Sequence, residues 1–178
     1  MTDRLTTQRL VLRRPDGRDT QAYIDFFTSE RASYIERMSE TAAWRAFAIE
    51  AGHWTIRHWG MFTVCLAGDE DTPIGLVGPW YPADWPEKEI GWILYPGHEG
   101  AGYAEEAARA TLTHAFCVLG WDTAVSYIDP ANSRSIALAE KLGARRDDAA
   151  PRKNPGDLVY RHDPALWLDA DGGMEAYA

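Results

Sequence analysis

The chain has 178 residues, a length that suits one domain with a full core, and we expect a single domain over residues 1–178. Its net charge of −9 argues against a protein that holds nucleic acid by neutralising phosphates. No apolar stretch approaches about 18 residues and the opening segment has no apolar signal core, so we expect a cytoplasmic protein without a membrane-spanning helix.

The two cysteines, Cys65 and Cys117, lie in apolar runs, and we expect both to be buried free thiols. Neither belongs to a Cys-x-x-Cys pair or lies beside a suitably spaced His, so we expect no metal site. The tail over about 168–178 is small and acidic, and we expect it to be loose.

Hydrophobic periodicity predicts an alternation of strands and helices along the chain. The expected strands cover residues 9–14, 61–68, 72–81, 88–96, 122–129 and 157–163. The expected helices cover residues 19–27, about 41–58, about 103–119 and 132–143. This order indicates an α/β fold with a mixed, mostly antiparallel central sheet of about six to seven strands and helices on both faces.

Capping residues set several of these boundaries. Asp19 is expected to open the first helix, and Asn132 and Gly143 are expected at the N-cap and C′ positions of the last one. In the second helix, the three-four spacing places four side chains on one face. They are Phe47, Ala51, Trp54 and His58.

The segment HEGAGYAEEA at 98–107 places two glycines directly before a helix. Gly100 and Gly102 can adopt backbone angles that other residues avoid, and the helix start offers free N–H groups and the positive end of its dipole. Together these features favour a site for an anion such as a diphosphate, although an ordinary turn remains the alternative. A P-loop would need a Lys here, and a dinucleotide fingerprint would need Gly where Glu105 stands.

With the preceding strand EIGWILYP, this loop resembles the cofactor motif of the GNAT superfamily of N-acetyltransferases. Gly102 and Ala104 match the last conserved pair of that motif. The opening TQRLVLRRPDGRD, the segment PIGLVG at 73–78 and DPANSRSIALAEKLGA at 129–144 are similar to motifs of the branch that contains the ribosomal-protein-alanine N-acetyltransferases. The resemblance covers roughly residues 5–163 and implies the GNAT fold, in which two neighbouring strands splay apart at the cofactor site.

The resemblance also implies acetyl-CoA as cosubstrate. The backbone of Ile93 and Leu94 would pair with the pantetheine arm. The pyrophosphate would meet the backbone N–H groups of Gly100, Ala101, Gly102, Tyr103 and Ala104. Asn132 and Ser135 match positions beside the pantetheine and the sulfur, although a plain N-cap explains Asn132 and a capping hydrogen bond explains Ser135 equally well.

Three residues depart from the family pattern. Glu99 stands where the family often has Arg or Gln, and a carboxylate beside a pyrophosphate is unfavourable unless it points away. Ala139 replaces the Tyr that often protonates the departing thiolate, and Ala144 replaces a Phe. The match therefore supports cofactor binding better than it supports a particular route for protons.

The expected reaction is direct attack by a neutral amine, which needs a base because a typical amine has a pKa near 10. Glu89 is the candidate base, since it begins the strand whose far end meets the cofactor and shares a face with Ile93. The alternative for Glu89 is an edge carboxylate in a salt bridge. Ser135 and Tyr127 are candidate acids, and His58 either lines the acceptor pocket or packs.

The acceptor is expected between the early helices and the loop 78–89, whose aromatic and acidic side chains suit a cationic amine or merely form a stiff surface hairpin. We expect an N-acetyltransferase that acts on a small amine or a protein N-terminus, with no nucleic-acid or membrane partner, as a monomer or a homodimer. The alternative is a non-catalytic CoA-binding sensor or interaction module. A basic run either meets the 3′-phosphate of CoA or forms a solvated loop; it comprises Arg145, Arg146, Arg152 and Lys153.

Overall fold

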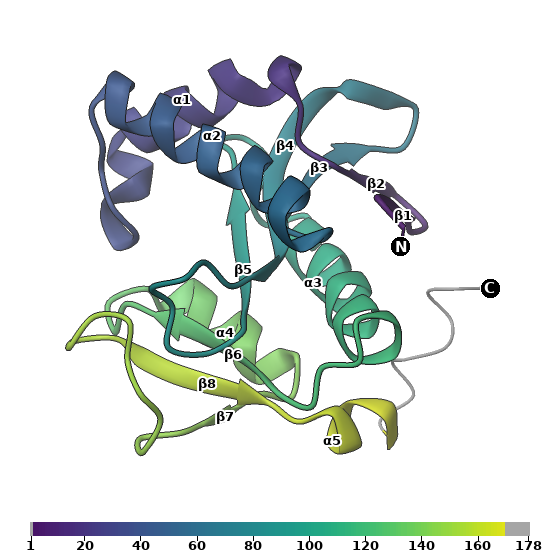
Figure 1. Ribbon diagram of the computed structural model, residues 1–178, viewed down its shortest axis with the longest axis vertical. Helices are drawn as coiled ribbons and strands as arrows, with labels where there is room; N and C mark the ends of the chain where they lie inside the picture. Colours follow the sequence, from purple (N-terminus) through teal and green to yellow (C-terminus); the bar gives the residue numbers. More distant parts are fainter. Residues whose placement is uncertain (1, 170–178) are drawn as a thin grey trace.

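The computed structural model of the protein describes residues 2–169, which fold around one eight-stranded sheet (Figure 1). The strand order is β1-β2-β3-β4-β5-β6-β8-β7. The strands are β1 (Arg4–Thr6), β2 (Leu10–Arg13), β3 (Phe62–Leu66), β4 (Asp69–Trp80), β5 (Glu89–Leu94), β6 (Ala124–Ile128), β7 (Arg145–Arg146) and β8 (Leu158–His162).

The helices follow the predicted order. The α-helices are α1 (Thr20–Thr28), α2 (Glu40–Arg57), α3 (Tyr103–Thr113), α4 (Ser133–Lys141) and α5 (Pro164–Asp169). Two short 3₁₀ helices, η1 (Gly17–Asp19) and η2 (Glu30–Tyr34), flank α1, and the π-helical turn η3 (His114–Val118) continues α3. The tail expected at about 168–178 lies, apart from the last two residues of α5, outside the described residues.

The predicted sheet type is confirmed. Every neighbouring pair of strands is antiparallel except β5 and β6, which are parallel. The six strands expected from the pattern are present, and β1 and β7 are additional. These two strands have three and two residues, which is too short for a period-2 pattern to be recognised.

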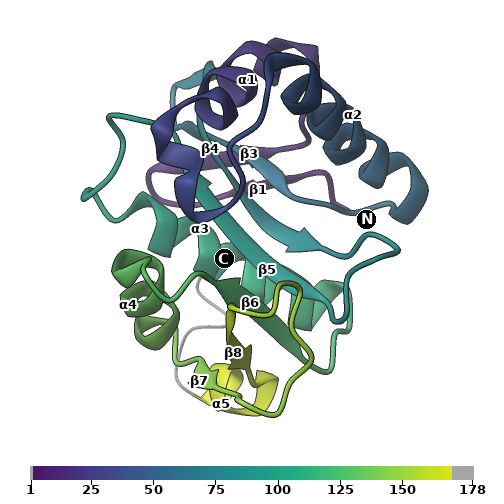
Figure 2. The same ribbon diagram turned by 90° about the vertical axis from the view of Figure 1, so that its left-hand side faces the viewer.

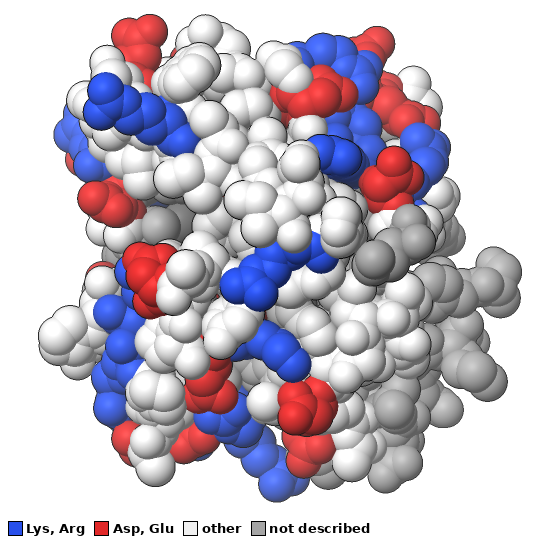
Figure 3. All heavy atoms as spheres, viewed as in Figure 1, with Lys and Arg blue, Asp and Glu red and all other residues white. Residues whose placement is uncertain are grey.

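Helices cover both faces of the sheet (Figure 2). On β4, Leu76 packs in a cluster with side chains of α1 and α2, whereas its neighbour Val77 packs in a cluster with the alanines of α3. This alternation follows from the period of two in a strand. Helix α4 packs against β6 and β8 through Ile128 and Ala139. On the face shown in Figure 3, acidic and basic side chains are interleaved and do not gather by sign.

The inner face of α2 differs from the predicted one. Phe47 and Trp54 are buried as their spacing suggests, but Ala51 is only partly buried and His58 is exposed, with a left-handed φ of 63° at the end of the helix. Glu50 is buried instead. The prediction used the spacing of apolar residues alone, so it did not assign the acidic Glu50 to the buried face of the helix.

Three local expectations also need correction or completion. Helix α1 begins directly after Asp19, but the Asp19 carboxylate caps no N–H of α1. It accepts from the Asp16 N–H in the capping box of η1, pairs with buried Arg13 and accepts from the Thr63 hydroxyl. Cys65 is buried as expected, whereas Cys117 is exposed, on the outer side of a π-helical turn whose residues His114, Ala115 and Phe116 are buried. The caps of α4 are as predicted, with Asn132 at the N-cap and Gly143 at a φ of 79°.

Candidate active site

Strands β5 and β6 part directly beyond a single residue pair. The ladder holds only Glu89 opposite Val125, and the Val125 N–H donates to the Lys88 carbonyl at 2.9 Å. One step along, the Ser126 hydroxyl, in place of a backbone group, donates to the Ile90 carbonyl at 2.7 Å. Beyond this bond no β5–β6 pair occurs in the described chain, so the two strands leave a gap between them.

Alternation along β5 decides which backbone groups face this gap. Just after the strand, the Tyr95 N–H donates to the carbonyl of Ile74 on β4, so odd-numbered residues bond towards β4 and even-numbered residues point towards β6. Trp92 and Leu94 therefore present their backbone to the gap. Of the predicted pair, Leu94 does so, whereas Ile93 turns its backbone to β4 and its side chain to the cavity described below.

The glycine loop adopts the backbone that its sequence allows. Gly100 and Gly102 have φ values of 78° and 82°, a region that favours glycine. Gly102 is the N-cap of α3 and supplies no side-chain capping bond, so no side chain there competes for the first N–H groups of the helix. A Cβ on Gly100 would meet nothing within 4 Å, so open space lies in front of that backbone. These features fit a diphosphate held by backbone N–H groups.

A clamp from the β1–β2 hairpin holds this loop, and sequence reasoning missed it. Arg9 donates to the Ala101 carbonyl at 2.9 Å and pairs with Glu106 of α3 at 2.7 Å. Its guanidinium also lies 4.9 Å from the centre of the Tyr103 ring. The only signal in the sequence was the opening motif that contains Arg9, which carries no indication of a partner about a hundred residues away.

The carboxylate of Glu99 is bound by groups other than the N–H groups of residues 100–104. It pairs with Arg31 of η2 and accepts from the Gly97 N–H at 2.9 Å. The departure from the family pattern at this position is therefore compatible with an anion bound on the neighbouring backbone.

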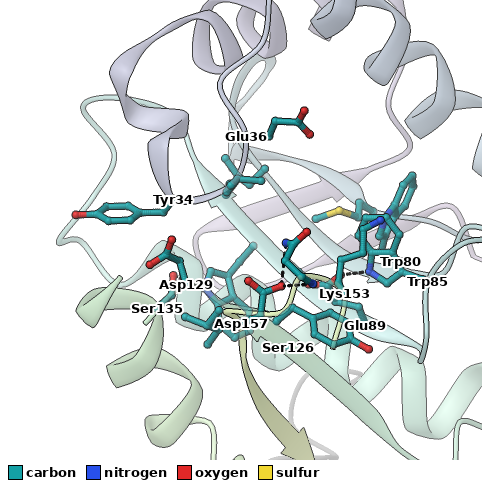
Figure 4. Close-up of a pocket in the computed structure, with 18 of the residues that line it drawn as sticks. Tyr34, Glu36, Trp80, Trp85, Glu89, Ser126, Asp129, Ser135, Lys153 and Asp157 are labelled. Carbon is teal, nitrogen blue, oxygen red and sulfur yellow. Dashed lines mark hydrogen bonds between the residues drawn. The ribbon is translucent and has the colours of Figure 1, made fainter. Parts of the chain in front are cut away.

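A cavity of about 610 Å³ lies against the gap and is walled by α1, η2, α2, β4, β5, β6 and the loop before β8 (Figure 4). Its large aromatic side chains are Tyr23, Phe27, Tyr34, Trp80, Trp85, Trp92 and Tyr127. Its carboxylates are Glu36, Glu50, Glu89, Asp129 and Asp157. Among its described lining residues Lys153 is the sole cation. The cavity is therefore aromatic and acidic, but two acids of the loop 78–89 do not line it: Asp84 pairs with Lys153 and Glu87 pairs with Arg161.

The structure places Glu89 where the two strands part. Its carboxylate accepts from the Trp85 indole at 2.5 Å, drawn as a dashed line in Figure 4, and interacts with the backbone N–H of Tyr127 across the gap. Burial raises the pKa of Glu89 to about 7, although both of these hydrogen bonds oppose the shift. Such a carboxylate can accept a proton near neutral pH.

Both candidate acids line the cavity. Ser135 Oγ accepts from the Trp92 indole at 3.2 Å, and the Ser135 N–H is capped by Asn132 Oδ1, so the hydroxyl proton is left to donate elsewhere. The Tyr127 hydroxyl is buried, and burial raises its pKa to about 12, although an interaction with the Glu87 backbone opposes the shift. Ala139 is fully buried in the core, and its methyl group cannot replace the tyrosine that often serves as the acid in the family.

The loop 78–89 and the basic run are divided between the cavity and other contacts. Trp80 and Trp85 line the cavity, whereas the Tyr81 ring lies 5.0 Å from the Arg57 guanidinium. Lys153 reaches the cavity, where its Nζ lies 3.2 Å from Asp84 and 4.2 Å from the centre of the Trp85 ring. The other three basic residues of the run do not line the cavity.

The histidines of α2 have structural roles. His53 is buried, and its Nε2 accepts from the Tyr81 N–H at 3.3 Å, so its Nδ1 carries the proton that bonds to the Trp59 carbonyl. Burial lowers the pKa of His53, consistent with a neutral ring. His58 is exposed and is not a lining residue, so the idea that it lines the acceptor pocket is wrong.

Glu50 is a buried acid that lines the cavity and was not predicted from the sequence. It lies on α2 and is 8% exposed. Its Oε2 has no hydrogen-bond partner among the described residues. Burial, with a further contribution from the charge of Glu89, raises the pKa of Glu50 to about 8.

The described residues contain no group of three or more His, Cys, Asp or Glu side chains arranged to hold a metal ion. No helix within residues 2–169 is long and apolar enough to cross a membrane.

The sequence matches the family model described as acetyltransferase (GNAT) domain over residues 9–145. It is 28% identical over 148 residues to the uncharacterized N-acetyltransferase YnaD of Bacillus subtilis. This match covers 80% of this chain and 83% of that protein. An acetyltransferase structure from Agrobacterium tumefaciens superposes with a TM-score of 0.86 at 40% identity, over 91% of this chain and 95% of that one.

A further solved structure shares the fold at lower identity. It is spermidine N-acetyltransferase from Vibrio cholerae in complex with CoA and spermine, with a TM-score of 0.71 at 19% identity. The match covers 91% of this chain and 99% of that chain. At this identity the likeness concerns the fold alone.

Proposed function

The chain belongs to the GNAT acetyltransferases, and we propose that it uses acetyl-CoA to acetylate a primary amine, either a small molecule or a protein N-terminus. The observation that carries the proposal is a single one: a carboxylate with a pKa near neutrality lies in an acidic, aromatic cavity at the point where β5 and β6 part. The candidate base Glu89 thus lies next to the backbone edge of β5 that is left unpaired where β5 and β6 part.

The residues around the gap can hold the pantetheine arm and the diphosphate of the cosubstrate. Trp92 and Leu94 offer backbone groups to an extended pantetheine arm, and the N–H groups of residues 100–104 would bind the diphosphate. Asn132 and Ser135 would lie beside its sulfur end. Acetyl-CoA, when bound, supplies an acetyl thioester that is reactive towards a neutral amine.

The cavity suits an acceptor that arrives as an ammonium ion. The ionised form of Glu89 attracts a cation, and Trp80 and Trp85 can stack on one. The spermine found with the Vibrio cholerae relative in fold is consistent with a cationic acceptor here. We therefore favour a cationic amine over a neutral or an acidic acceptor.

Glu89 is the proposed base. In its ionised form it removes one proton from the ammonium group, and the neutral nitrogen then attacks the carbonyl carbon. The new N–C bond forms as the C–S bond breaks, and the second proton of the nitrogen passes to solvent, because Glu89 already holds the first. Ser135, whose hydroxyl proton is free to donate, is the proposed donor to the departing thiolate, with Tyr127 as the second candidate.

Cofactor binding is tested first by thermal melting with and without acetyl-CoA and CoA. Ligand at 100 times its Kd stabilises the folded state by about 2.7 kcal/mol, which raises the Tm of a chain this size by roughly 2–4 °C. No shift at saturating ligand, together with no heat of binding in calorimetry, would show that only the fold is shared.

Catalysis is tested by the pH dependence of thiol release. With the pKa of Glu89 at about 7, kcat/KM should rise about tenfold per pH unit below pH 7 and level off above it. In Glu89→Gln the plateau should disappear, and the rate should follow the free amine up to its own pKa near 10. An unchanged profile in the variant would remove Glu89 from the mechanism.

A further inference from the structure

Glu50 has a buried carboxyl group that the folded protein leaves incomplete. Glu50 lines the cavity from α2, is 8% exposed, and has one buried oxygen without a hydrogen-bond partner among the described residues. Burying a polar group without a partner costs folding free energy, and buried polar atoms in proteins are nearly always paired. A ligand that donates to Glu50 would remove this penalty.

Within residues 2–169, the groups that interact electrostatically with Glu50 provide no positive charge. Tyr23 of α1, Tyr95 after β5 and Glu89 on β5 interact with it electrostatically, and they are two phenols and an acid. Lys153, the cation among the described lining residues, is already paired with Asp84 and lies over the Trp85 ring. A counter-ion for Glu50 must therefore come with the ligand.

Glu50 and Glu89 occupy different walls of the cavity. Glu89 lies at the gap between the strands, next to the backbone N–H of Tyr127, whereas Glu50 belongs to the helical wall. The reacting nitrogen must lose its charge before it attacks, so it cannot remain the partner of a second carboxylate. Glu50 is therefore left for a charged group of the ligand that does not react.

We propose that Glu50 determines acceptor specificity by binding a second, non-reacting ammonium group, so that the enzyme selects amines that carry two positive charges. The proposal rests on the proposed function and adds the class of acceptor to it. Glu50 holds the charged end that does not react, and Glu89 serves the end that does.

The protonation of Glu50 agrees with this role. Burial first, and the charge of Glu89 second, raise its pKa to about 8, so the ligand-free site holds mostly the uncharged acid at neutral pH. An ammonium group against the carboxyl favours the ionised form and thereby a charge-assisted hydrogen bond. Without such a ligand, the acid stays neutral.

The test compares α,ω-diaminoalkanes of three to six carbons with n-alkylamines of the same length. Binding is measured by calorimetry with CoA in place of acetyl-CoA, so that no acetyl group can be transferred, and kcat/KM is measured separately with acetyl-CoA. The variants are Glu50→Gln and Glu50→Met. The control is Glu36→Gln, which removes the same charge from an exposed lining residue that lies apart from the other labelled carboxylates in Figure 4.

Wild-type protein should bind at least one diamine about tenfold or more tightly than its matched monoamine. Both Glu50 variants should reduce that ratio to within about twofold, while binding CoA as wild type does, and Glu36→Gln should preserve it. A wild type with no preference for diamines, or a preference that survives in both Glu50 variants, would overturn the proposal. If the preference depends on Glu50 but no amine releases thiol from acetyl-CoA, the binding role stands and the catalytic function fails.

Discussion

Replacing the buried acid of α2 by an amide should make the protein more stable at alkaline pH. The pKa of Glu50 rises from its ordinary value of 4.5 to about 8 on folding. Between these values the unfolded chain carries a carboxylate while the folded chain still binds the proton. The folded state therefore holds more protons, and the free energy of unfolding falls as the pH rises through this window. Glu50→Gln cannot ionise, so it does not share the loss.

The size of the effect follows from the same two values. A difference of about 3.5 pH units, at about 1.36 kcal/mol per unit, corresponds to about 5 kcal/mol at most. Water that enters the open cavity reduces the penalty of the charged form, and we expect Glu50→Gln to gain about 2 kcal/mol or more over wild type at pH 9. At pH 4 to 5 both side chains are neutral, so the two proteins should differ little.

Urea unfolding of wild type, Glu50→Gln and the exposed control Glu36→Gln at pH 5, 6, 7, 8 and 9 measures this difference directly. Subtracting the wild-type curve from that of each variant cancels the other groups that titrate in the window. A difference curve for Glu50→Gln that stays flat from pH 5 to 9 would mean that Glu50 is not held in a desolvated, unpaired site, and the argument for its ligand would lose its basis.

Three further outcomes test other parts of the site. Arg9→Ala, which removes the clamp on the glycine loop, should weaken CoA binding about five- to tenfold in calorimetry, whereas Arg4→Ala on the same hairpin should not; equal effects would show that the clamp is only a surface contact. Gly102→Ala, at a φ of 82°, should cost about 1 kcal/mol and lower the Tm by roughly 2–4 °C, and an unchanged Tm would refute the strain. Ser135→Ala should lower kcat about tenfold and Tyr127→Phe less than twofold; the reverse order would make the phenol the acid.

The parts of the site that depend on local backbone chemistry were predictable from the sequence. Gly100 and Gly102 adopt the positive φ that only glycine takes readily, and Asn132 caps the helix that it precedes. These inferences need only neighbours within a few residues. Glu89 was found because it begins the predicted strand that the family resemblance places against the cofactor.

The parts that depend on contacts between distant segments were not predictable. Arg9 meets Glu106 across 97 positions, and no short motif encodes that pair. The point at which β5 leaves β6 is set by a side chain, the Ser126 hydroxyl, that takes the place of a backbone group. Glu50 was missed because an acid on the buried face of a helix contradicts the hydrophobic count, and local rules fail at such positions when a site requires them.

The most direct measurement of the account is the release of free thiol from acetyl-CoA by the purified chain at pH 8, with and without amines. Mono- and diamines serve as acceptors, and mass spectrometry identifies the product. The account predicts release that depends on the amine, is stoichiometric with an acetylated amine, and falls below pH 7 but levels off above it, a plateau that Glu89→Gln abolishes. Tight binding of acetyl-CoA with no amine-dependent release would contradict it and would leave a CoA-binding module in the same fold.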